Sequence, residues 1–180
     1  MEKITLNSLF QSFEMGLRMP KAVKPKEYLK SLGLDYTDLR IGFNSGQFHH
    51  NISQELKDNY EALGVIQKSN AGVSKEGMTA YTVFGRYSVV FPLMNQKNEV
   101  VNLFAIRFDM ETQQAEYLNS EGIYPNYPPP LTKRLYLVPT VLDCASLMQS
   151  KILENRDSVM ALHKGDLLPQ HLEAIKTIVP

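Results

Sequence analysis

The stretch that decides the fold runs from Arg134 to Met148 and reads RLYLVPTVLDCASLM. Its first five residues, 134–138, are rich in Leu, Val and Tyr and predict a short buried strand. After a turn at Pro139 and Thr140, apolar residues recur at helical spacing, which predicts an amphipathic helix. A buried strand that leads directly into such a helix is typical of the start of a parallel βα unit.

The loop between this strand and helix offers little for catalysis. Parallel α/β folds place their chemistry at the carboxyl ends of strands, and the polar residues here are Thr140 and Asp143. A carboxylate at a helix start caps the helix and complements its dipole, so we prefer a capping role for Asp143 over metal binding. Cys144 is the only cysteine, which excludes an internal disulfide and a thiolate zinc cluster. We expect it to be a small core residue.

The sequence after this unit predicts another of the same kind. Residues 158–162 predict a second parallel strand, Gly165 and Asp166 its turn, and Pro169 opens a last amphipathic helix. A parallel unit of this size leaves an open sheet edge.

The middle of the chain predicts antiparallel strands. Residues 81–93 and 100–108 are dense in aromatic and β-branched side chains and flank a turn at 95–98, which is typical of a long hairpin. Residues 115–119 predict a further strand. The proline-rich segment 124–130 is stiff and extended, and we prefer a spacer over a docking site for a partner domain.

The N-terminal part predicts three helices. Apolar residues at helical spacing mark one over 5–17, a second that starts at Pro25 and ends at Gly33, and a third capped by Asn51 and Gln54.

The segments between these helices are polar or short. We interpret the basic segment 20–25 as a linker rather than a phosphate contact, 39–43 as a short strand and 69–77 as a mobile loop. His49 and His50 are adjacent, but no further ligand follows at a usual metal-site spacing, so we expect solvated loop histidines.

Composition excludes several classes of protein. The chain has 180 residues, 43% of them hydrophobic, which is enough for a core, and its formal net charge of zero gives no global attraction to polyanions. No apolar run approaches the length of about 18 residues that a membrane helix needs, and the N-terminus lacks a signal-peptide pattern. We expect a cytoplasmic protein in a reducing compartment, without membrane contact.

Several motifs occur in an order that resembles a known family. They are YLKSLGL at 28–34, FPL at 91–93, VVNLFAIR at 100–107, YLNS at 117–120, LYLV at 135–138 and GDLLPQ at 165–170. In this order the motifs resemble the RNA-polymerase core of bacterial DnaG-type DNA primases, where that core enters its Toprim domain. The resemblance covers residues 25–180.

The resemblance implies a fold class and a division of the chain. We expect an α+β fold, in which N-terminal helices and an antiparallel sheet precede a partial parallel, Toprim-like βαβα segment. The divisions are an N-terminal helix and linker at 1–24, a primase-core-like subdomain at 25–130 and the partial Toprim-like segment at 131–180.

The departures from the family concern its chemistry. The Glu-Gly that ends the family's first Toprim strand is replaced by Pro139 and Thr140, and the family lysine before Tyr-Leu-Asn-Ser is Glu116. The arginine just before Phe-Pro is replaced by Ser88, with Arg86 two residues upstream as a substitute. The family's paired metal-binding aspartates would lie beyond the last residue, and its zinc module would need cysteines that this sequence lacks.

These departures leave no evident metal site. Nucleotidyl transfer needs a metal to neutralise phosphate charge, and Mg²⁺ prefers clustered carboxylates, whereas Asp109, Asp143 and Asp166 fall on separate predicted elements. We expect no cofactor in this chain, and Mg²⁺ only if carboxylates are supplied elsewhere. The chain alone is not expected to synthesise primers.

The resemblance does imply nucleic-acid contacts. Arg107 lies where the family presents a basic residue to the strand, and the further candidates are Arg86, Lys97, Tyr117, Asn119, Lys133 and Arg134. Arginine can grip phosphate through two hydrogen bonds, and Tyr117 could stack on an unpaired base. The alternative for Arg107 is an ion pair with Asp109 or Glu116. So few contacts predict weak, strongly salt-dependent binding.

Three functions follow as hypotheses. We prefer a primase-like core module of a replication or mobile-element protein, which binds single-stranded DNA or primer-template weakly and works with other domains of a larger primase-like protein or with a helicase. The second is a non-catalytic protein-interaction module that uses segment 124–130 and an exposed sheet edge. The third is an active nucleotidyl transferase with unusual metal ligands.

Overall fold

The fold is α+β, as the sequence predicts. The structure, a computed structural model, describes residues 4–73, 79–109 and 114–178. The helices are α1 (Leu6–Arg18), α2 (Val23–Ser31), α3 (Gln54–Ala62), α4 (Val141–Gln149) and α5 (Pro169–Lys176). The strands are β1 (Gly42–Asn44), β2 (Ile66–Val73), β3 (Thr79–Val83), β4 (Ser88–Met94), β5 (Val100–Arg107), β6 (Gln114–Tyr117), β7 (Arg134–Val138) and β8 (Asp157–Ala161).

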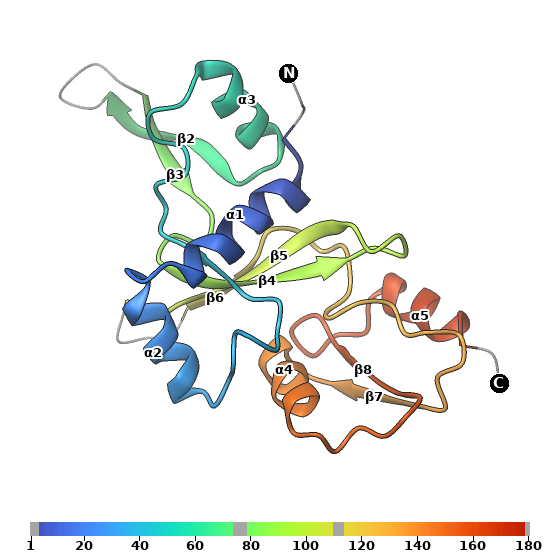
Figure 1. The fold of residues 1–180 in the computed structure, drawn as a ribbon. Coiled ribbons are helices and arrows are strands. Elements are labelled where there is room, and N and C mark those ends of the chain that lie inside the picture. The colour runs from blue at the N-terminus through green and yellow to red at the C-terminus, as the bar shows by residue number, and fades with distance from the viewer. Residues whose placement is uncertain (1–3, 74–78, 110–113, 179–180) are drawn as a thin grey trace.

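A four-stranded antiparallel sheet with the order β1-β4-β5-β6 lies at the centre (Figure 1). Every residue of β4 is buried, because both faces of the sheet are covered. Val90 packs with α1 in one hydrophobic cluster, whereas Val89 and Phe91 pack with residues of α2 and α4 in another. The second cluster joins the sheet to the C-terminal helix α4, so the hydrophobic core continues past residue 130.

The predicted hairpin is present, but its first strand is shorter than predicted. Residues 81–93 do not form one strand; they are divided between β3 and β4 by a turn at 84–87. Gly85 and Tyr87 both have positive φ there, of 57° and 52°. A Cβ on Gly85 would come within 2.8 Å of the Ala105 Cβ, so the turn needs glycine at this position.

A second, two-stranded antiparallel sheet of β2 and β3 projects from the central sheet, with α3 beside it (Figure 1). The prediction of a mobile loop over 69–77 is wrong for 69–73, which belong to β2, and 74–78 lie outside the described residues. The predicted cap of α3 is also wrong, because Ser53 rather than Asn51 caps the helix and accepts a hydrogen bond from the Leu56 amide.

The C-terminal βαβα unit is confirmed. β7 and β8 are parallel, with α4 between them in the chain and α5 after them. Thr140 caps α4 by accepting a 3.1 Å hydrogen bond from the Asp143 amide, and its hydroxyl donates to the Asp143 carboxylate at 2.6 Å. Thr140 rather than Asp143 is therefore the N-cap, and the structural role expected of Asp143 is confirmed in its place in the first turn and its bond to the Thr140 hydroxyl.

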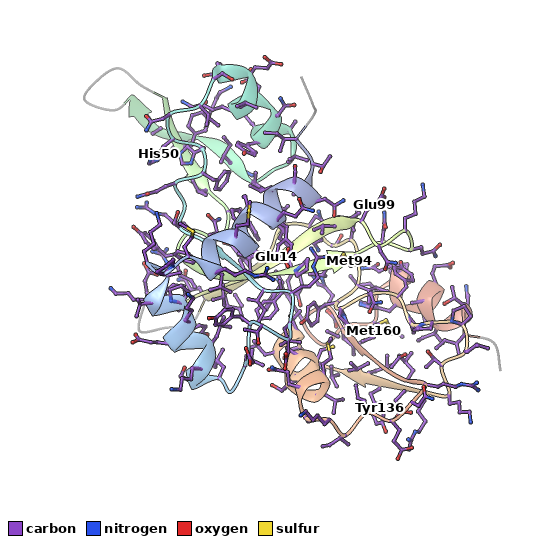
Figure 2. All side chains as sticks on the ribbon, in the orientation of Figure 1. Glu14, His50, Met94, Glu99, Tyr136 and Met160 are labelled. Carbon is purple, nitrogen blue, oxygen red and sulfur yellow. The ribbon has the colours of Figure 1, made fainter. Side chains whose placement is uncertain are left out.

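The prediction that 134–138 is a buried strand is wrong. No residue of β7 is fully buried, and Leu137 is 44% exposed. Within the described residues β7 pairs only with β8, so its other edge carries no strand. Figure 2 shows Tyr136 on this outer strand.

Segment 124–130 is packed against the parallel pair. Tyr124 is buried, and its carbonyl accepts a 2.9 Å hydrogen bond from the Ala161 amide. Pro128 is buried as well. The alternative in which this segment is a free docking surface is therefore wrong for its two buried residues.

Cys144 is a buried core residue, as predicted, and burial raises the pKa of its thiol to about 12. We expect the folded protein at mildly alkaline pH to react with a thiol reagent about a thousandfold more slowly than a free cysteine, because so little thiolate forms. The reaction would be followed by absorbance, and full reactivity should return in guanidinium chloride. Rapid labelling of the folded chain would contradict this burial.

Candidate nucleic-acid interface

Two of the predicted basic residues line one polar hollow of about 510 Å³. Arg86 comes from the turn between β3 and β4, and Arg107 from the end of β5. The remaining walls are Val83, Gln114, Ala115 and Glu116. The strand register explains why the two arginines lie close together. Ser88 lies opposite Arg107, and Arg86 is two residues before Ser88 in the adjoining turn.

Arg86 is an exposed side chain that lies across the neighbouring loop. Its guanidinium carbon is 5.3 Å from the centre of the Tyr87 ring. Gly46, with φ of 81°, leaves room for its aliphatic part, since a Cβ there would come within 2.5 Å of the Arg86 Cγ. The guanidinium is therefore held at the mouth of the hollow without a carboxylate partner among the described residues.

Arg107 forms an ion pair with Asp109, which the sequence predicted as the alternative to a nucleic-acid contact. Its Nε and Nη2 both donate to the carboxylate, the latter at 3.1 Å, and the side chains are 35% and 33% exposed. The hydrogen bond from Arg107 holds the pKa of Asp109 below its ordinary value. A guanidinium has five N–H donors, and the two bonds leave three for an incoming phosphate.

Glu116 closes the hollow, and it has a structural task. Its Oε1 accepts a 2.9 Å hydrogen bond from the Gly85 amide, which fixes the turn that carries Arg86. From the sequence, Glu116 was identified as a reversed charge and as a possible ion-pair partner of Arg107, but not as a support for this turn. The link to Gly85 depends on the β5–β6 pairing and leaves no local signal in the sequence. Two carboxylates thus face two guanidinium groups, and the hollow has little net charge.

Tyr117 is not an open stacking platform. Its ring centre lies 4.6 Å from that of Phe104 and 4.0 Å from that of His163, which follows β8. Burial raises the pKa of the Tyr117 hydroxyl and lowers that of His163. Nothing in the sequence indicated a contact between His163 and Tyr117. A base that stacked on Tyr117 would have to displace this imidazole.

The remaining candidates lie away from the hollow. Lys97 is exposed on the β4–β5 turn, at the other end of the hairpin from Arg107. Figure 2 labels Glu99, which lies in the same connection. The Asn119 amide bonds the Val101 carbonyl and the Glu121 N–H, so it orders its own loop. Lys133 is exposed at the start of β7.

Arg134, at the start of β7, forms ion pairs with β8 and with the segment before it. Its Nε donates to Asp157 at 2.8 Å and its Nη2 to Glu154 at 2.6 Å. Hydrogen bonds, first from Arg134 and then from the Glu154 amide, lower the pKa of Asp157. Contact of Arg134 with nucleic acid stays a prediction.

This ion pair predicts a pH dependence. We expect Arg134→Gln to lower the melting temperature at neutral pH. A carboxyl with a lowered folded pKa stabilises the protein above its unfolded pKa of about 3.9 and loses this effect as the pH falls through the folded pKa. The difference between wild type and variant should therefore shrink in acid. Thermal melts followed by circular dichroism test this, and a constant difference down to the acid limit would contradict it.

The histidine pair departs from expectation. His49 is buried, and its Nδ1 has no hydrogen-bond partner among the described residues, whereas His50 is exposed. The His49 ring packs edge-on against Phe48, His50 and Tyr81, and burial lowers its pKa. The prediction of solvated histidines is wrong for His49, because the β2–β3 sheet that covers it was predicted as part of a longer strand and a loop.

The residues present do not fit a primase-type Mg²⁺ site. Pro139 has no side-chain oxygen, and the Asp143 carboxylate is engaged by Thr140. Among residues 4–73, 79–109 and 114–178, no group of three or more His, Cys, Asp or Glu side chains could hold a metal ion.

None of the described helices is long and apolar enough to cross a bilayer.

Comparison with solved structures identifies the fold. A DNA primase domain from Pseudomonas aeruginosa has a TM-score of 0.73 at 16% identity, over 97% of this chain and 59% of that one. The E. coli primase catalytic core gives 0.73 at 16% over 96% and 58%. A DnaG primase catalytic domain bound to single-stranded DNA gives 0.69 at 16% over 95% and 58%.

This likeness confirms the resemblance as one of fold, that of the DnaG-type primase core. The chain spans 58–59% of the length of these solved domains. Neither a protein-family model nor a curated protein matches the sequence.

Proposed function

We propose that this chain is a primase-core-like module of a replication or mobile-element protein and binds single-stranded DNA or primer-template weakly. The observation that carries the proposal is the meeting of Arg86 and Arg107 in one polar hollow. One solved domain with this fold is bound to single-stranded DNA, which supports nucleic acid as the ligand. The C-terminal βαβα unit is, on this proposal, a partial Toprim-like segment.

The hollow is suited to the phosphate backbone rather than to base sequence. Arg86 and Arg107 offer guanidinium N–H groups, which bind phosphate oxygens with charge-assisted hydrogen bonds. Asp109 and Glu116 oppose this attraction at close range. We therefore expect weak binding at low salt that falls steeply as salt is added.

We propose no primer synthesis by the isolated chain. Pro139 stands where the family has a glutamate, and the nearby Asp143 carboxylate is engaged by Thr140, so any catalytic carboxylates would have to come from other domains of a larger protein. A primer-synthesis assay with Mg²⁺ and the isolated chain should give no product, and product formation would favour the transferase hypothesis.

Glu116 offers a gain-of-binding prediction. Glu116→Gln removes one negative charge from the hollow but keeps an oxygen that can accept from the Gly85 amide. We expect affinity for labelled single-stranded DNA to rise about threefold to tenfold at low salt, because repulsion of the phosphate is lost. Fluorescence anisotropy measures this.

The matched control is Glu121→Gln, an exposed carboxylate that does not line the hollow. Equal affinity of wild type and Glu116→Gln, with an unchanged melting temperature, would count against this hollow as the binding site.

A further inference from the structure

The junction of α1 and α2 carries a positive charge that the proposed DNA site does not use. Residues 18–30 contain five basic side chains and one acidic one, on a chain whose net charge is zero. Arg18, Lys21, Lys24 and Lys30 are exposed, and none forms an ion pair with a described residue. Cations that do form ion pairs, such as Arg107 and Arg134, lie on other elements.

The same junction exposes apolar side chains. Val23 is 52% exposed and Met19 is 48% exposed, and Met15 lies one helical turn before Met19 with 63% exposed. Exposed large apolar residues beside unpaired cations are typical of an interaction surface rather than of a solvated helix face.

A hollow of about 550 Å³ lies between α2 and the loop that follows it. Val23, Lys26, Glu27 and Lys30 recur at helical spacing and form one wall, and the buried Leu34 and the half-buried Tyr36 belong to the loop side.

Lys26 keeps this hollow in shape. Its Nζ donates to the Met19 carbonyl at 2.9 Å and lies 5.5 Å from the centre of the Tyr36 ring. On the loop side, Asp35 Oδ1 accepts hydrogen bonds from the Thr37 amide and hydroxyl. This carboxylate oxygen therefore bonds within its own loop. The hollow therefore combines the apolar surfaces of Val23, Leu34 and Tyr36 with charged side chains, of which Lys26 and Lys30 are basic and Glu27 is acidic.

We infer that this surface docks an acidic peptide segment of a partner protein, with an apolar side chain of the peptide in the hollow and its carboxylates on the surrounding lysines and Arg18. Charge complementarity selects a polyanion. The exposed Met19 and Val23 favour a peptide over nucleic acid, because aliphatic side chains offer neither hydrogen bonds to phosphate nor an aromatic face for a base, and Lys26 lies over the Tyr36 ring. The inference is independent of the DNA site.

The test uses the full chain and a fluorescein-labelled peptide, rich in aspartate and glutamate, that carries phenylalanine side chains. A second peptide has serine in place of phenylalanine, and a labelled oligothymidine is titrated in parallel. We expect the first peptide to bind, Lys30→Glu to weaken it about fivefold to tenfold, and Val23→Ser to weaken it about threefold.

The matched control is Lys97→Glu, which makes the same change of net charge on the distant β4–β5 turn and should change peptide affinity by less than about twofold. Both lysines and Val23 are exposed, so the variants should fold. Absence of peptide binding, equal binding of both peptides, or loss of oligothymidine binding alone in Lys30→Glu would each overturn the inference.

Discussion

Replacing Arg86 and Arg107 together by glutamine is expected to weaken binding of single-stranded DNA by about 30-fold or more at low salt. Each guanidinium can donate two charge-assisted hydrogen bonds to phosphate, and glutamine has neither the charge nor the fork of donors. The two side chains share one hollow, so their loss removes the whole binding surface that we propose. Anisotropy titration of a labelled oligonucleotide measures the effect.

The control for this variant is Lys151→Gln with Lys176→Gln, which removes the same charge from exposed positions outside the hollow. It should change affinity only slightly, since its charges are far from the proposed contacts. If both double variants lose affinity equally, binding follows net charge, and the hollow is not a site.

Asn102→Ala is expected to destabilise the fold by about 3 kcal/mol, the largest effect on stability that we predict for a single polar residue. Asn102 is fully buried in β5, and its amide donates to the carbonyls of Asn119 and Glu121 at 2.9 and 2.8 Å. Its Oδ1 accepts from the Asn119 amide at 3.0 Å. Alanine would leave these backbone groups without partners.

Urea unfolding measures this loss: the urea concentration at the midpoint should fall, while the m-value should not change. Asn126→Ala is the control, because Asn126 is exposed and should change stability by less than about 0.5 kcal/mol. A loss for Asn102→Ala that is no larger than that of the control would mean that the loop after β6 does not depend on this amide.

The sequence predicts best where the signal is local. The helical spacing of Leu6 to Leu17 and the strand-turn-helix at 134–148 were sufficient to place α1, β7 and α4, since each pattern is complete within a few turns. The α+β class follows from the order of such patterns.

The sequence predicts least where the decisive contact is distant. Residues 81–93 are dense in strand-forming side chains, and the need for glycine at the turn between β3 and β4 comes from the approach of Gly85 to Ala105 on another strand. The imidazole of His163 on Tyr117 likewise depends on how the C-terminal unit packs against the sheet. Burial of β7 was overestimated because apolar composition does not reveal how many neighbours a strand has.

The candidate site shows the same division. Arg86 and Arg107 were named from the sequence, and the hairpin register brings them together. An ion pair of Arg107 with a carboxylate, which competes with phosphate for the guanidinium, was predicted only as an alternative. The structure shows this ion pair, with Asp109 as the partner. Lys97 was assigned to the same group because of its charge. It lies at the opposite end of the hairpin and does not line the hollow.

The salt dependence of single-stranded DNA binding tests the central claim most directly. Fluorescence anisotropy at several salt concentrations would be measured for wild type and Arg107→Ala. We predict detectable binding at low salt, and a slope of log affinity against log salt that is smaller by about 0.7 in the variant, because one phosphate contact is lost. Absence of binding at low salt, or an identical slope in both proteins, would contradict the proposed interface.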